Sequence, residues 1–138
     1  MTGNTAASST VVESGRMGRV AWARLAPNED LVQGIEKICQ AEGFMNAFVR
    51  GALGSLVDAC LGLPNGQVRQ VRGPGVEIVS LSGEVRSDAE GARHVQLSGV
   101  VADTQGKLHG GPFTAGANLV LMTFEVTLEE WLPGWQPA

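Results

Sequence analysis

The fold is decided by the stretch Val76-Glu77-Ile78-Val79-Ser80-Leu81-Ser82-Gly83-Glu84-Val85. Runs rich in valine, isoleucine and leucine, interrupted by polar residues, are typical of β-strands. We therefore predict one long strand here. Its apolar side chains fall on both faces over part of its length, so both faces of the strand need cover. The turn Gly73-Pro74-Gly75 precedes the strand, and a second turn over 88–91 follows it.

Further strands are predicted downstream of this stretch. Residues 94–102 form one strand, and the hairpin connection Asp103-Thr104-Gln105-Gly106 joins it to residues 107–109. Gly106 suits the positive φ that such a connection requires. Residues 119–128 predict a last strand with an unbroken apolar face. That face is formed by Val120, Met122, Phe124, Val126 and Leu128.

Upstream, the sequence predicts a short strand, a helix and two more strands. The short strand covers 20–25, and the two later strands lie within 46–61, with a break near Gly54-Ser55. A turn at Pro64-Asn65-Gly66 follows them.

One amphipathic helix is predicted between these upstream strands. Leu31, Ile35 and Ile38 recur at i, i+4 and i+7 spacing, which places them in one apolar stripe. Asn28 is placed as the N-cap, and the two acidic residues after it lie where the helix dipole favours negative charge. Gly43 is placed just beyond the last turn, where a left-handed conformation ends many helices.

These elements predict an α+β domain, with a mostly antiparallel β-sheet and one main amphipathic helix packed on it. Several strands carry more apolar residues on their second face than one helix can cover. A subunit interface would bury this surplus. The segment Trp131-Leu132-Pro133-Gly134-Trp135 adds aromatic residues of the kind that anchor interfaces.

The composition indicates one globular domain. The chain has 138 residues, of which 43% are hydrophobic and 17% charged. Residues 1–17 are small and polar, so we expect a flexible N-terminal tail followed by a single domain over 18–138. Cys39 and Cys60 lie in apolar surroundings without metal-binding spacing. We see neither a signal peptide nor a run of about 20 apolar residues, so we expect a cytoplasmic protein without a membrane partner.

Four segments in register resemble the PPC domain family, the plants and prokaryotes conserved domain. Residues 28–31 are similar to the family's helix start, and residues 51–58 to its small-residue Gly-Ser segment. Residues 76–83 are similar to its Ser-Leu-Ser-Gly strand, and residues 102–111 to its Ala-Asp-x-x-Gly-x-Val-x-Gly-Gly hairpin. Their order and spacing agree over about residues 19–128. The resemblance implies a PPC-like antiparallel sheet with a flanking helix, assembled as a homotrimer.

Two departures from the family pattern bear on function. Plant members follow AT-hooks, but Gly15-Arg16-Met17-Gly18-Arg19 lacks the Arg-Gly-Arg-Pro core of an AT-hook. Many prokaryotic members carry three metal-binding histidines, and the corresponding positions here are Gln96, Ser98 and Pro112. An amide, a hydroxyl and a proline form a poor ligand set for Zn²⁺ and similar ions. We therefore expect no metal and no cofactor.

The best candidate site is a polar pocket on one strand face and the hairpin beside it. It is formed by His94, Gln96, Ser98, His109, Gly110 and Gly111. One interpretation is a small-ligand pocket, and the other is a pair of histidines that only make structural hydrogen bonds.

Other reactive residues point to structural roles. Ser55 and Ser98 lack the surroundings of an activated nucleophile, and no base is assigned to either. Glu77 on a central strand would need a charged partner if it were buried, and Arg50 or Arg86 could provide it.

Two functions stay open. The first is a trimeric interaction module that associates with DNA or with a DNA-associated protein, as the stand-alone bacterial members of the family are often described. A net charge of −4 argues against direct contact with phosphates. The second is a small-molecule-binding protein or enzyme with its pocket at the subunit interface. No catalytic constellation stands out, so the sequence favours a function other than catalysis, and catalytic residues are unassigned.

Overall fold

The computed structural model describes residues 9–134 of the chain. One helix and eight strands lie within these residues. In chain order they are β1 (Gly15–Leu25), α1 (Leu31–Glu42), β2 (Ala47–Leu56), β3 (Ala59–Gly62), β4 (Val68–Val71), β5 (Val76–Ser87), β6 (Arg93–Ala102), β7 (Leu108–Pro112) and β8 (Val120–Pro133).

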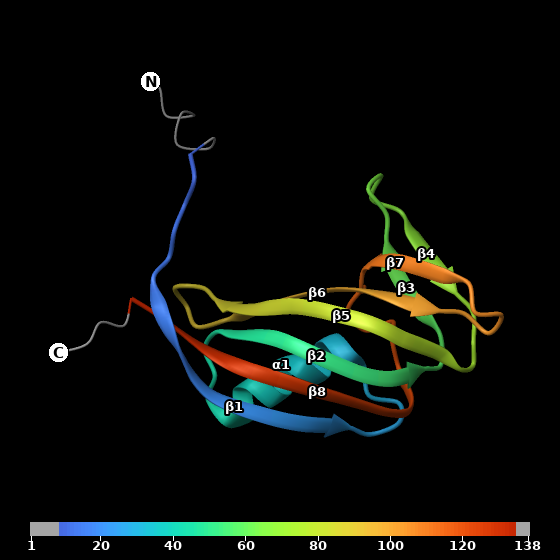
Figure 1. Cartoon of the computed structure of the whole chain (residues 1–138), viewed down its shortest axis with the longest axis horizontal. Helices are drawn as coiled ribbons and strands as arrows, with labels where there is room; N and C mark the ends of the chain where they lie inside the picture. Colours follow the sequence, from blue (N-terminus) through green and yellow to red (C-terminus); the bar gives the residue numbers. More distant parts are fainter. Residues whose placement is uncertain (1–8, 135–138) are drawn as a thin grey trace.

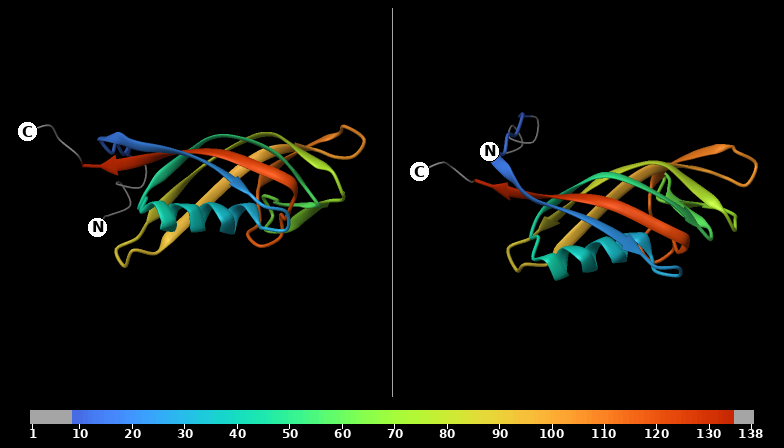
Figure 2. Two further views of the ribbon diagram at one scale, coloured as in Figure 1. Left: turned by 90° about the horizontal axis from the view of Figure 1, so that it is seen from below. Right: turned by 60° about the horizontal axis from the view of Figure 1, so that its bottom comes forward.

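Six strands form one antiparallel sheet in the order β1-β8-β2-β5-β6-β7 (Figure 1). β3 and β4 pair separately, and Leu61 of β3 makes an isolated bridge to Phe113 just after β7. α1 lies against one face of the large sheet (Figure 2). The opposite face over β1, β8, β2 and β5 is covered by no helix of the described chain, and we call it the open face. The predicted α+β class is confirmed.

β5 is the long strand predicted from residues 76–85. Val76 and Val85 are fully buried, and Ile78 and Leu81 are nearly so. The pairing with β6 shifts between Ile78 and Ser80, so Val79 leaves the core pattern and is 55% exposed. The bulge explains why apolar residues fall on both faces of this strand.

The helix begins two residues later than predicted. Asp30, not Asn28, is the N-cap, and its carboxylate accepts a hydrogen bond from the N–H of Gln33 at 2.9 Å. Asn28 instead has φ 72° and donates its N–H to the carbonyl of Val120 at 2.8 Å. Gly43 takes the expected left-handed conformation, with φ 75°.

Two strands differ from the predictions in their bounds. β1 begins at Gly15, and Glu13 bonds to Arg86 and to Trp131, so the predicted tail over 1–17 is too long. Residues 1–8 of that tail, and Trp135, lie outside the described residues. β2 runs unbroken through Gly54, and the chain leaves it only after Leu56.

The predicted apolar face of β8 is wrong at one position. Four of its five residues are buried, but Met122 is 73% exposed. The pairing of β8 with β2 shifts at this point, from Gly54↔Phe124 to Leu56↔Val120, so Met122 has no ladder partner on β2 and departs from the buried pattern.

Both cysteines are buried free thiols, as the sequence predicts. Burial raises the pKa of the Cys39 thiol to about 11. Within residues 9–134, no helix is long and apolar enough to cross a membrane.

Candidate functional site

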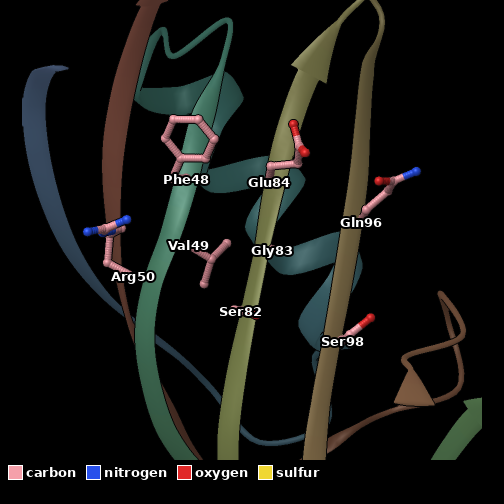
Figure 3. Close-up of a pocket in the computed structure, with 8 residues that line it drawn as sticks. All are labelled: Phe48, Val49, Arg50, Ser82, Gly83, Glu84, Gln96 and Ser98. Carbon is pink, nitrogen blue, oxygen red and sulfur yellow. The ribbon is translucent and has the colours of Figure 1, made fainter. Parts of the chain in front are cut away.

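Two of the predicted site residues lie in a hollow formed by β6 and the adjoining part of the open face. Gln96 and Ser98 project from β6, where they pair with Glu84 and Ser82 of β5 (Figure 3). The hollow has a volume of about 380 Å³. It is lined by Phe48, Val49, Arg50, Ser82, Gly83, Glu84, Gln96 and Ser98.

A second hollow of about 360 Å³ adjoins the first along β5 and β6. The two share Ser82 and Ser98, and the second also includes Gly110 and Gly111 of β7. Four of the six predicted site residues are therefore gathered along one continuous surface. The strand pairing places them there, because Gly110 and Gly111 lie opposite Val100 and Gly99 in the β6–β7 ladder.

The two predicted histidines line neither hollow. Each instead contacts an aspartate in the turn of a β-hairpin. His94 Nε2 lies 2.9 Å from Asp88 Oδ2, and His109 Nε2 lies 2.9 Å from Asp103 Oδ2. The other carboxylate oxygen of each aspartate accepts two backbone N–H groups of its own turn. The hydrogen bond from the histidine, reinforced by these N–H groups, lowers the pKa of both aspartates.

The three positions at which the family resemblance would place metal-binding histidines do come together. Gln96 and Ser98 share one face of β6, and Ser98 is paired directly with Pro112 of β7. Their side chains offer an amide, a hydroxyl and no donor, which does not fit a transition-metal ion. Among residues 9–134, no group of three or more His, Cys, Asp or Glu side chains could hold a metal ion.

Ion pairs surround the first hollow. Arg50 Nε lies 3.1 Å from Glu129 Oε1 on β8. Arg86 forms an ion pair with Glu84 and another with Glu13, at 2.6 Å from Glu13 Oε1. These hydrogen bonds raise the pKa of Arg86, and the bonds from Arg86 and the Trp131 indole lower the pKa of Glu13.

Glu77 does not have the role that the sequence suggested. Its side chain is exposed, and neither Arg50 nor Arg86 contacts it, so that pairing is wrong. Ser55 is buried, and its hydroxyl accepts the N–H of Met122 at 3.4 Å. This contact is structural.

Sequence reasoning missed Phe48, Arg50, Ser82 and Glu84 as site residues. The turn over 88–91 fixes the pairing of the strands on either side of it, so Ser82 opposite Ser98 could have been found. No comparable signal exists for Phe48 and Arg50, because β2 reaches the site through a long connection rather than a hairpin.

The arrangement of one helix on this six-stranded sheet is shared with known proteins. A family model, Plants and Prokaryotes Conserved domain, matches residues 12–132. The chain belongs to this family. Two segments that carry the resemblance, 76–83 on β5 and 102–111 on the β6–β7 hairpin, lie side by side around the second hollow.

Three solved structures share the fold. A plant- and prokaryote-conserved protein from Pyrococcus horikoshii is 21% identical, with 94% of this chain and 99% of that chain covered, and a TM-score of 0.74. A metal-containing protein from Archaeoglobus fulgidus is 23% identical over 90% and 87% of the two chains, with a TM-score of 0.74. A presumed DNA-binding protein from Bacteroides thetaiotaomicron is 16% identical over 86% and 83%, with a TM-score of 0.71.

Among curated proteins, the chain is similar to part of a longer one. It is 34% identical over 114 residues to the bifunctional protein GlmU of Synechococcus sp. strain JA-3-3Ab, with 83% of this chain covered. The match spans only 17% of the GlmU chain. This chain therefore spans less than a fifth of the length of the curated protein that it matches.

Proposed function

We propose that this PPC domain is a self-associating interaction module, a homotrimer, whose open face forms subunit contacts. The observation that carries the proposal is Trp22, which is 60% exposed on the open face although it belongs to a paired strand. Val20 and Leu53 of the same face are exposed to a similar degree. Large exposed apolar side chains on one sheet face are typical of a contact surface.

The charges of the open face favour burial against protein. Arg24 pairs with Glu125 at 2.9 Å, and Arg50 pairs with Glu129 at 3.1 Å. Paired charges cost less to remove from water than unpaired ones. The same pairing makes these arginines poor partners for phosphates, and the net charge is −4. We therefore assign the module an indirect association with DNA, through a DNA-associated protein.

Light scattering after size-exclusion chromatography tests the assembly. We expect a mass of about 43 kDa, three times the 14.4 kDa of the chain. Trp22→Glu would place an unpaired charge in the contact, and we expect it to shift the mass to that of the monomer. Val68→Glu is the matched control, because Val68 is similarly exposed but lies on β4, away from the open face. A wild-type monomer would contradict the assembly.

An electrophoretic mobility-shift assay tests the DNA part of the proposal. At low salt we expect no complex between the wild-type protein and a mixed-sequence duplex. Low salt is chosen because it strengthens any contact with phosphates. A complex whose affinity falls steeply with added salt would show direct binding and overturn the indirect role.

The two adjoining hollows favour a second function, which is binding of a small molecule. Ligand sites are concave and carry a few convergent polar groups, as these hollows do. A ligand that binds only the folded state raises the midpoint of thermal unfolding. We expect a metabolite panel to contain such a stabiliser, and a panel without one would contradict this function.

A further inference from the structure

β2 and β5 separate in the middle of the large sheet. Their ladder pairs stop at Val49↔Gly83 and resume at Ser55↔Glu77. The same number of residues separates the two pairs on β2 and on β5. The register of the two strands is therefore the same on either side of the interruption. Over this interval β2 still pairs with β8, and β5 still pairs with β6. Over this interval β2 is therefore paired only with β8, and β5 is paired only with β6.

This gap leaves main-chain polar groups facing it. In residues 50–54 and 78–82, the N–H and C=O groups that a continuous ladder would join form no β2–β5 pair. Such groups require a polar partner. A Cβ atom added to Gly51 would meet nothing within 4 Å, so the space over this part of the gap is open. Figure 3 shows Arg50 on β2 and Ser82 on β5, the residues on the two sides of this part of the gap.

The first hollow lies where the ladder stops. Val49 and Gly83 form the last ladder pair and line it, together with Arg50 and Ser82. Beside the gap, the side chains of Ser82, Ser98 and Gln96 make no hydrogen bond to another residue of the described chain. A hydroxyl or an amide both donates and accepts hydrogen bonds. Main chain and side chains thus present donors and acceptors to the same space.

The charges around the hollow are already matched. Arg50 is paired with Glu129, and Glu84 is paired with Arg86. A charged ligand would find no counter-charge without breaking one of these pairs. Arg50 engages Glu129 through Nε, so the guanidinium keeps further N–H donors. Phe48 adds an apolar edge to the hollow.

We infer that this hollow binds a neutral polyhydroxylated small molecule, such as a monosaccharide or a cyclic polyol. Every hydroxyl of such a ligand both donates and accepts, which matches the mixed groups of the gap and of Ser82, Ser98 and Gln96. Its C–H faces suit contact with Phe48, and its lack of charge leaves the ion pairs intact. The inference rests on the proposed small-molecule function and names the class of ligand.

Nuclear magnetic resonance titration of the ¹⁵N-labelled full chain tests the class. The probes are D-glucose and myo-inositol, and the charged comparisons are glucuronate and glucose 6-phosphate. With glucose or inositol we expect saturable shifts, with a Kd of about 1 to 10 mM. The shifts should be confined to amides of 48–54, 78–84 and 96–99. Gln96→Leu should weaken binding about tenfold, because a ligand hydroxyl would lose its partner.

Gln105→Leu is the matched control, because Gln105 lies in the β6–β7 turn outside both hollows. Ser98→Val gives a second test of the hollow if Gln96→Leu loses its dispersed spectrum. Unlocalised or non-saturating shifts with both neutral probes would overturn the inference, as would unchanged affinity in the hollow variants. If the metabolite panel stabilises the protein but only charged compounds bind, the ligand class is wrong and the small-molecule function stands.

Discussion

At the scale of the residue, Asn118 is buried and joins three segments that lie far apart in the sequence. Its Oδ1 accepts the N–H of Cys60 at 2.7 Å, and its Nδ2 donates to the carbonyls of Thr114 and Cys60. Its own N–H donates to the Asp30 carboxylate at 2.9 Å. Asn118 thereby ties the start of α1 and strand β3 to the loop before β8. No local sequence pattern predicts this role, because the partners in β3 and at the start of α1 come close to Asn118 only in the folded protein.

Asn118→Ala should lower the free energy of unfolding by about 2 to 4 kcal/mol. The substitution leaves the N–H of Cys60 without its partner in a buried place. Urea denaturation measures the change. Asn65→Ala is the control, because Asn65 makes similar bonds in an exposed turn, where water replaces them. Equal losses in the two variants would contradict the structural role.

At the scale of the element, the sequence predicts regular strands and hairpins well and irregular strands poorly. The alternation in 94–102 and the turn residues 103–106 predict the β6–β7 hairpin, since the signals are local. Gly54 suggested a break, yet β2 continues through it with φ 153°. Gly54 is needed for close approach rather than for a turn. This role becomes clear only from the backbone of β8 beside Gly54. No pattern in the sequence indicates that β8 lies there.

Gly54→Ala should destabilise the fold by about 2 to 3 kcal/mol. A Cβ at this position would lie 2.3 Å from the carbonyl oxygen of Thr123, which is backbone and cannot move aside cheaply. Gly51→Ala serves as the control on the same strand, since its Cβ would meet nothing within 4 Å. Thermal and urea denaturation of both variants measure the difference. The interpretation fails if Gly51→Ala is the more damaging change.

The β6–β7 ladder leads to a prediction about metal binding. Wild-type protein titrated with Zn²⁺ in a calorimeter should show no binding tighter than micromolar, because Gln96, Ser98 and Pro112 lack imidazole groups. The triple variant Gln96→His, Ser98→His, Pro112→His should bind Zn²⁺ more tightly than micromolar, since the ladder places these positions together. The double variant without the Pro112 change is the control. Tight binding by the wild type would contradict this account of the site.

At the scale of the whole molecule, the candidate site shows how far a sequence can lead. Gln96, Ser98 and the Gly110-Gly111 pair were predicted, since one hairpin brings them together. Phe48 and Arg50 arrive from β2, which lies next to β5 only because the sheet order is not the chain order. The gap between β2 and β5 is likewise a property of the assembled sheet. Long-range pairing sets these features, and local periodicity says nothing about it.

The stability of the protein at acid pH depends on the whole molecule, because carboxylates in three separate surface regions contribute to it. Hydrogen bonds lower the pKa of Glu13, Asp88 and Asp103 in the folded state. The unfolded chain, with ordinary values of 4.5 for Glu and 3.8 for Asp, therefore binds more protons as the pH falls through this range. The stability that these carboxylates contribute is present above about pH 4.5 and is lost as the pH falls through their folded-state values.

Replacing all three by their amides, as Glu13→Gln, Asp88→Asn and Asp103→Asn, should flatten the dependence of stability on pH below about 4.5. The measurement is the urea midpoint between about pH 3 and pH 6. A matched triple variant, Glu36→Gln, Glu77→Gln and Glu90→Gln, removes the same charge from side chains that make no hydrogen bond or ion pair within residues 9–134. It should retain the steeper wild-type profile. Equal flattening in both variants would mean that net charge, rather than these three hydrogen-bonded carboxylates, governs the acid response.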